Sequence, residues 1–202
     1  MLKVHVQRGF TLIELMVGIA VFACLMAIGA PSFSTWIQNS QIRTAAEAIQ
    51  NGIHLARVEA VRRNTSVRFQ LIDTLTNACA LSTSGRNWVV SLDPAAGACD
   101  AAPSADLAAP TAPRVIQSRA AGAGASRAVI AADQSSIVFN GLGRVTPVPG
   151  GNINIDITNP TGGACAAANG PMRCMRVVVS AAGQVRLCDP RFASSDAQGC
   201  GT

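Results

Sequence analysis

One carboxylate lies where a charged group is unfavourable. Glu14 is the only charged residue in the apolar run from Phe10 to Ala30, which follows a short leader containing Lys3 and Arg8. A charged side chain at bilayer depth costs about 2.5–3.5 kcal/mol on insertion scales, so such a residue normally has a partner and a function. The run is too long for the apolar core of a signal peptide. The alternative interpretation is that the run is a signal anchor and that its glutamate has no function.

Cysteines are the second set of residues that could do chemistry. Six lie after the apolar run, and a seventh, Cys24, lies within it. An even number in an oxidising compartment indicates disulfides, and six cysteines allow 15 pairings. We favour pairing between sequence neighbours, because each pair closes a short loop: Cys188–Cys200, Cys165–Cys174 and Cys79–Cys99. A zinc site is the alternative, but the sequence has no Cys-x-x-Cys pair, so we expect no metal site.

The sequence offers little for catalysis. His54 is the only histidine after the leader, and any Ser–His–Asp or Cys–His site would depend on it. Gly141-Leu142-Gly143 is not followed by the Lys-Ser/Thr pattern of a phosphate-binding loop. We therefore expect no enzyme, no catalytic residues and no cofactor.

A long helix is expected to carry Glu14. Residues Phe10–Ala30 number 21, which is a membrane-spanning length at a rise of 1.5 Å per residue. Beyond Pro31, apolar residues recur at spacings of four and three and indicate one helix face: Ile42, Ala46, Ile49, Ile53, Ala56 and Ala60. Arg62-Arg63-Asn64 is a typical helix end. We expect one helix from about Phe10 to Arg63, loosened at Pro31, with Trp36 either at the membrane interface or in packing.

After Asn64 the apolar period changes from 3.6 to 2, which predicts strands. The expected strands are Ser66–Leu71, Trp88–Leu92, Arg114–Gln117, Ser136–Phe139, Arg144–Thr146, Asn152–Ile157, Met175–Ser180 and Gln184–Leu187. Asn140-Gly141 is a hairpin signal, and Leu92–Arg114 is typical of a loop. The fold class is α+β, with a long N-terminal hydrophobic helix packed on a mostly antiparallel sheet. The expected parts are a leader (1–9), a membrane helix (10–31), a stem helix (32–64) and a disulfide-bonded head (65–202).

The leader carries a resemblance to a known superfamily. Gln7-Arg8-Gly9, followed by Phe10-Thr11-Leu12-Ile13-Glu14-Leu15, closely resembles the class III leader of type IV pilins and pseudopilins. The resemblance implies that a prepilin peptidase cuts after Gly9 and methylates the new N-terminal residue, Phe10. It also implies that Glu14 meets the N-terminal amine of a neighbouring subunit during assembly. Such an amine is cationic near neutral pH, and pairing two buried charges offsets the desolvation of each.

Two later segments resemble one branch of this superfamily, the GspH/FimT family of minor pilins. They are Ser136–Arg144, with its Phe139 and Gly141, and the C-terminal run from Cys174 to Pro190. The resemblance implies a minor type IV pilin that is inserted in the inner membrane, with a periplasmic head, and then joins the pilus to prime or cap its assembly. The implied partners are major and other minor pilins, the prepilin peptidase and the inner-membrane assembly platform. A GspH-like minor pseudopilin of a type II secretion system is the alternative.

In this branch a Gly-Arg-x-Arg motif in the last hairpin is tied to DNA binding during uptake. This chain has Gly183-Gln184-Val185-Arg186, so the resemblance leaves Arg186 as the charged contact there, with Gln184 able to hydrogen-bond a phosphate. Arg176 and Arg191 lie near it in the sequence, and after Gly9 the chain has 14 arginines, no lysine and 11 acidic residues. The alternative is an ordinary solvated edge strand.

Overall fold

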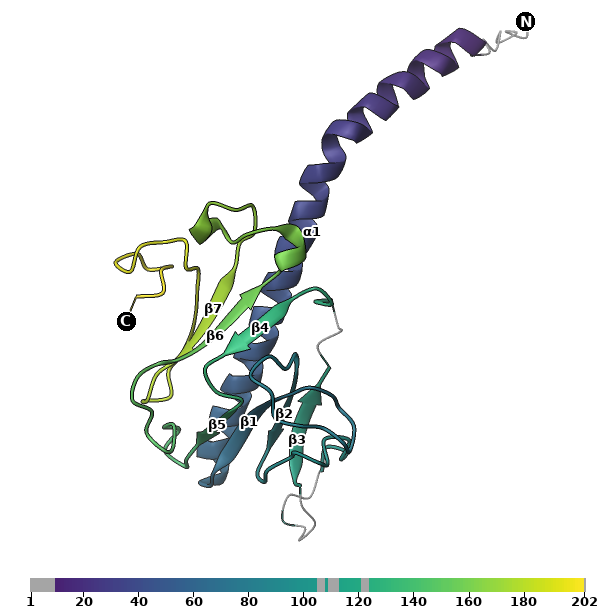
Figure 1. Ribbon diagram of the computed structural model, residues 1–202. Helices are drawn as coiled ribbons and strands as arrows, with labels where there is room; N and C mark the ends of the chain where they lie inside the picture. The colour runs from purple at the N-terminus through teal and green to yellow at the C-terminus, as the bar shows by residue number, and fades with distance from the viewer. Residues whose placement is uncertain (1–9, 105–107, 109–112, 121–123, 202) are drawn as a thin grey trace, which may run out of the picture. The chain divides into compact units, whose positions relative to one another are not determined.

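The computed structural model describes residues 10–201, except for 105–107, 109–112 and 121–123 (Figure 1). The chain divides into two compact units, Met1–Ile37 and Gln38–Thr202. One helix, α1 (Leu12–Arg63), contributes to both units, and the strands all belong to the second. We call the second unit the head.

Both ends of α1 have recognisable caps. Thr11 precedes its first residue, and Asn64 follows its last with a left-handed φ of 49°. The Asn64 amide donates to the Val61 carbonyl at 3.2 Å, and the Thr65 amide donates to the Ala60 carbonyl at 3.1 Å. This pair of bonds is the Schellman arrangement, with asparagine in the place that glycine usually takes. The helix therefore ends where the Arg62-Arg63-Asn64 signal predicted.

Among the described residues, no single helical stretch is long and apolar enough to cross a membrane by itself. The stretches Leu12–Ala27 and Ser32–Arg63, on either side of a break, meet that requirement together by length and composition.

The head contains two antiparallel four-stranded sheets. The first has the order β3-β2-β1-β5 and the second the order β4-β6-β7-β8. The strand bounds are β1 Val67–Ile72, β2 Asn87–Ser91, β3 Val115–Arg119, β4 Val129–Ala132, β5 Ser136–Phe139, β6 Ile153–Thr158, β7 Met175–Val179 and β8 Val185–Cys188. Short 3₁₀ turns, η1 (Pro160–Gly162) and η2 (Ala166–Ala168), lie between β6 and β7.

The apolar face of α1 forms the core with both sheets (Figure 1). Ile49 and Ile53 share one buried cluster with Phe69 of the first sheet and Ile155 of the second. All six residues of the predicted helix stripe, from Ile42 to Ala60, are buried. The α+β class, with a helix packed on antiparallel strands, is therefore confirmed.

The strands expected from the sequence differ from the observed strands in two places. Arg144–Thr146 is not a strand: Val145 forms an isolated bridge with Phe139, and the chain turns from Asn140 to Arg144. Pro147 follows at once and has no amide hydrogen to continue a ladder. Strand β4 was not predicted at all, because two of its four residues are alanines, which strands disfavour.

Three disulfides join sequence neighbours. They are Cys79–Cys99, Cys165–Cys174 and Cys188–Cys200, with separations of 20, 9 and 12 residues. Cys79 and Cys99 lie in a second, smaller buried cluster with Val89 and Val115. The first disulfide therefore joins the connection between β1 and β2 to the segment after β2.

Candidate assembly site on the helix and candidate surfaces on the head

Glu14 closes a hydrogen-bonded ring with Thr11 at the start of α1. One Glu14 carboxylate oxygen accepts from the Thr11 amide at 3.1 Å and from the Thr11 hydroxyl at 3.0 Å. The Glu14 amide donates back to the Thr11 hydroxyl oxygen at 3.3 Å. This is a capping box, in which threonine precedes the helix and glutamate stands three residues later. The Thr-x-x-Glu spacing is visible in the sequence, but the sequence reasoning missed this use of Thr11.

The first unit exposes apolar side chains along its helix and at Phe10, just before the helix begins. They are Phe10, Leu12, Ile13, Leu15, Met16, Val17, Ile19, Val21, Phe22, Leu25, Met26, Phe33 and Trp36. Soluble monomers rarely expose contiguous apolar surfaces larger than a few hundred Å², and larger ones mark contacts with proteins or membranes. Glu14 is thus a carboxylate on a surface that lipid or other helices would cover. Trp36 stacks on Phe33 with ring centroids 5.9 Å apart.

The predicted cleavage site spans the edge of the described region. Gly9 lies outside the described residues, whereas Phe10 is described and exposed. Cleavage after Gly9 and methylation of Phe10 stay predictions.

The predicted DNA-binding residues come from the last hairpin and the tail after it. Arg186 lies in β8 and Arg176 in β7, while Gln184 lies in the turn that joins these strands. The Arg176 guanidinium holds Asp156 on β6 through bonds of 2.7 and 3.0 Å, and this ion pair raises the pKa of Arg176. Arg186 donates to the Gly201 carbonyl.

Arg191 is also engaged within the chain. Its guanidinium lies 3.8 Å from the Asp189 carboxylate and stacks 4.5 Å from the centre of the Phe192 ring. Each of the three arginines thus has a separate partner, and the structure does not gather them around one free site. A phosphate would compete with these contacts.

A junction that the sequence reasoning did not identify lies beside this hairpin. Gly183, in the β7–β8 turn, has a φ of +79°, and Gly143, in the turn after β5, has a φ of +72°. A Cβ on Gly183 would lie 1.9 Å from the Gly143 carbonyl oxygen, and a Cβ on Gly143 would lie 2.9 Å from Val61 of α1. The two turns and the end of α1 are therefore packed against one another. The two glycines were the available signal for these turns in the sequence. That the turns lie close together depends on the topology of the fold.

An ion pair fixes both ends of the segment between β2 and β3. The Arg114 guanidinium donates to Asp93 through two bonds of 2.7 Å. These bonds, together with the Arg114 amide at 3.0 Å, lower the pKa of Asp93 to about 2. The loop predicted at Leu92–Arg114 is thus anchored where it leaves and rejoins the first sheet.

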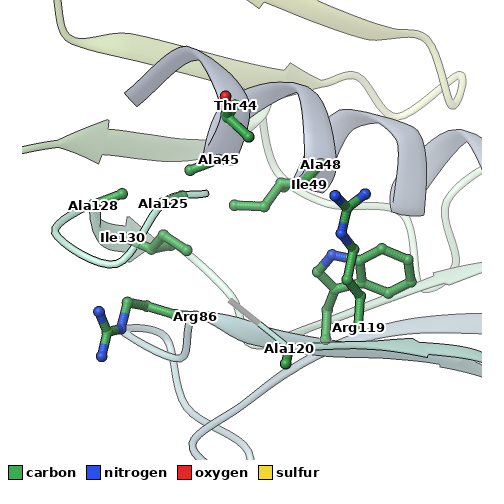
Figure 2. Close-up of a pocket in the computed structure, with 11 residues that line it drawn as sticks. Thr44, Ala45, Ala48, Ile49, Arg86, Arg119, Ala120, Ala125, Ala128 and Ile130 are labelled. Carbon is green, nitrogen blue, oxygen red and sulfur yellow. The ribbon is translucent and has the colours of Figure 1, made fainter. Parts of the chain in front are cut away.

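A small cavity lies between α1 and the two sheets (Figure 2). Its volume of about 20 Å³ has room for about one water molecule, far below the size of a cofactor site. Figure 2 shows Thr44, Ala45, Ala48 and Ile49 projecting from the helix toward it. Among the described residues, no group of three or more metal-ligating side chains comes together, and His54 is half-buried on α1.

Comparisons with known proteins identify two matching models. The family model described as "Type II transport protein GspH" matches residues 45–183, and a "Prokaryotic N-terminal methylation motif" matches residues 5–30. No curated protein matches this chain.

Two solved structures of the minor pilin FimU from Pseudomonas aeruginosa (strain PAO1) are similar to this chain. The crystal form in space group P65 has 15% identity and a TM-score of 0.47, and it covers 78% of this chain and 98% of that one. The form in space group P21 has 16% identity and a TM-score of 0.46, covering 79% and 95% respectively.

The family match covers more than half of the chain, and it spans α1 from Ala45 onward, the whole first sheet, and β4, β6 and β7 of the second sheet. The methylation motif covers the end of the leader, the capping box and the exposed apolar helix as far as residue 30. The chain therefore belongs to the GspH family of pilin-like proteins.

Proposed function

We propose that this chain is the precursor of a minor type IV pilin. A prepilin peptidase cuts after Gly9 and methylates Phe10, and residues 10–31 then hold the subunit in the inner membrane with its head in the periplasm. The assembly platform extracts the subunit into the pilus, where it primes or caps assembly together with major and other minor pilins. No enzymatic step belongs to the proposal.

The observation that carries the proposal is a methylation motif on an exposed apolar helix with one carboxylate. The motif match spans residues 5–30, and Glu14 is the acid within it. Lipid can cover this helix before assembly, and the helices of other subunits can cover it afterwards. The same apolar surface thus suits a protein that moves from a membrane into a filament.

Glu14 supplies the specific contact in the proposal. One of its carboxylate oxygens accepts both Thr11 bonds, so the cap and an ion pair can use different oxygens. The amine of a neighbouring processed subunit is the proposed cation. In an apolar helix bundle, removing either charge leaves the other buried and unpaired, which strongly disfavours the assembled state.

The second candidate is a minor pseudopilin of a type II secretion system. The description of the matching family, a type II transport protein, favours it. Both candidates share processing, membrane insertion and helix packing, and they differ in the machine that the subunit joins.

Deletion of the gene separates the two candidates. The pilus role predicts loss of surface pili and twitching, restored by a plasmid copy, with unchanged export of secreted enzymes. Normal pili together with failed export would instead assign the subunit to secretion. A complementing copy that carries Glu14→Ala should still lose its leader, as measured by its mobility on gels.

DNA binding through Arg186, Gln184, Arg176 and Arg191 stays a prediction with its own test. The detergent-solubilised full chain is mixed with duplex DNA at low salt and then at rising salt. Binding is measured as a shift in the electrophoretic mobility of the DNA. If the hairpin binds phosphates, Arg186→Gln weakens this shift and reduces its salt dependence. A shift that is unchanged in Arg186→Gln, or no shift at low salt, rejects binding at this site.

A further inference from the structure

An exposed surface surrounds the junction of α1 with the two glycine turns. Val58, Val61 and Leu142 are its apolar members, with exposed fractions of 58%, 51% and 78%. Arg57 lies on α1 beside them, and Arg144 ends the turn that carries Leu142. We call these five residues the turn patch.

The turn patch is held in place by close packing and hydrogen bonds. Gly143 has Val61 and the Arg57 side chain within 3.5 Å of its Cβ position. Gly141 has Asn64 within 3.0 Å of its own Cβ position, so the Leu142 turn rests on the capped end of α1. The Asn140 side chain also accepts from the Leu142 amide at 3.0 Å and from the Arg144 amide at 3.1 Å. A surface fixed in this way loses little conformational entropy when a partner binds.

The charge of the patch is not compensated within the described part of the chain. Neither Arg57 nor Arg144 forms an ion pair with a described carboxylate. Other head arginines do: Arg63 is held by Glu59 at 2.7 Å and Arg114 by Asp93 at 2.7 Å. In the part of the chain that the structure describes, the patch therefore combines exposed apolar groups with two arginines that have no ion-pair partner, the half-buried Arg57 and the exposed Arg144.

We propose that the turn patch is a docking surface for an acidic, partly apolar segment of another pilin-like subunit. The proposal rests on the proposed function, which supplies the neighbouring subunits. Apolar side chains of the partner would cover Val58, Val61 and Leu142, and its carboxylates would pair with Arg57 and Arg144. Charge complementarity of this kind selects the partner and its orientation more than it raises affinity.

A protein segment fits this surface better than a nucleic acid. Interfaces with DNA are polar and strongly cationic, and much of their affinity comes from contacts with phosphates. Here three exposed aliphatic side chains accompany the two arginines, and these have no counterpart on a phosphate backbone. Interfaces between proteins, by contrast, have an apolar centre with a polar rim.

The test is photo-crosslinking in living cells with the full-length chain. A benzophenone amino acid replaces Leu142, and a matched control replaces Leu81, which is exposed and lies outside the patch. After irradiation, filaments are sheared from the cells and the adduct is identified by mass spectrometry. The expected result is an adduct from position 142 with a pilin-like subunit, joined at a segment that contains Asp or Glu.

Charge reversal then tests the proposed pairing. Arg144→Glu, an exposed change, and Arg57→Glu should each reduce the adduct at least about tenfold, because like charges then face each other. Arg127→Glu, an exposed arginine outside the patch, should leave the adduct unchanged. Intact disulfides in each variant, measured by mobility on non-reducing gels, show that the head is folded.

Three results would overturn the proposal. The first is incorporation of the subunit into filaments with no pilin adduct at position 142, and the second is a pilin adduct that Arg144→Glu does not reduce. Adducts of position 142 with DNA in place of protein would also overturn it. Absence of the unmodified chain from sheared filaments would instead contradict the proposed function, so the two failures are distinguishable.

Discussion

At the residue scale, Glu14 has two separable properties, the hydrogen bonds of its oxygens and its charge. Its bonds to Thr11 cap α1, which stabilises helix ends by about 1 kcal/mol. The charge is favourable beside the N-terminus of the helix, but it is costly at bilayer depth on an otherwise apolar segment. The importance of the charge stays a prediction from the sequence, where a lone carboxylate in an apolar run is conspicuous. The cap needed only the Thr-x-x-Glu spacing and was overlooked.

Gly183 supports a prediction at this scale. Replacement by alanine forces a side chain into a left-handed backbone and toward the Gly143 carbonyl oxygen. We expect Gly183→Ala to lower the free energy of unfolding by about 2 kcal/mol or more. The measurement is urea unfolding of the full chain in detergent, followed by Trp88 fluorescence in a Trp36→Phe background.

The matched control is Gly150→Ala. Gly150 has no atom within 4 Å of its Cβ position and no left-handed φ, so this variant should unfold almost as the unmodified chain does. Equal free energies of unfolding for the two variants would contradict the close packing of the Gly183 turn against the Gly143 turn.

At the element scale, the sequence predicted those helices and strands whose apolar residues recur at the period of a single type of secondary structure. The stripe from Ile42 to Ala60 follows the helix period and is buried. Strand β4 was missed because Ala131 and Ala132 have a low strand propensity. They are in a strand because they pair with β6. The strand predicted at Arg144–Thr146 was wrong because Pro147 limits the ladder after a single bridge. Tertiary pairing decided the first case and is not encoded in the local sequence, whereas Pro147 was a local signal that the sequence reasoning overlooked.

The Asp93–Arg114 ion pair gives a prediction about pH. The pKa of Asp93 falls from 3.8 to about 2 on folding, so the stabilisation is fully present above pH 3.8 and is lost as the pH falls toward 2. Because the pair is partly exposed, we expect Asp93→Asn to cost about 1 kcal/mol at neutral pH. Urea unfolding at pH 7 and pH 2 should show this difference shrinking at low pH. An undiminished difference at pH 2 would contradict an electrostatic cause.

The Cys79–Cys99 disulfide gives a second prediction for an element. It closes the longest of the three cysteine loops, with a separation of 20 residues. The chain-entropy model expects its removal, as the Cys79→Ser/Cys99→Ser pair, to cost about 3 kcal/mol. Removal of Cys165–Cys174, separated by 9 residues, should cost less. Thermal unfolding of both double variants measures the order, and the reverse order would contradict the loop-length argument.

At the scale of the whole molecule, the two units have opposite surface chemistry. The first exposes apolar side chains along a helix, whereas the second has a buried apolar core between α1 and two sheets. The leader motif was enough to predict the first unit, because membrane length and a lone acid are sequence properties. The turn patch could not be predicted, since Arg57 meets Leu142 and Arg144 through the packing of two segments that are distant in the sequence.

The central claim is that the charge of Glu14 serves entry into a filament. Glu14→Gln tests it most directly, because a glutamine can still accept the Thr11 bonds but carries no charge. The measurement is the amount of the subunit in sheared filaments relative to the amount in membranes, compared with the unmodified chain and with Thr11→Ala. Glu14→Gln should lose its leader normally yet be depleted from filaments at least about tenfold, and Thr11→Ala should be depleted less. Normal incorporation of Glu14→Gln would contradict the account.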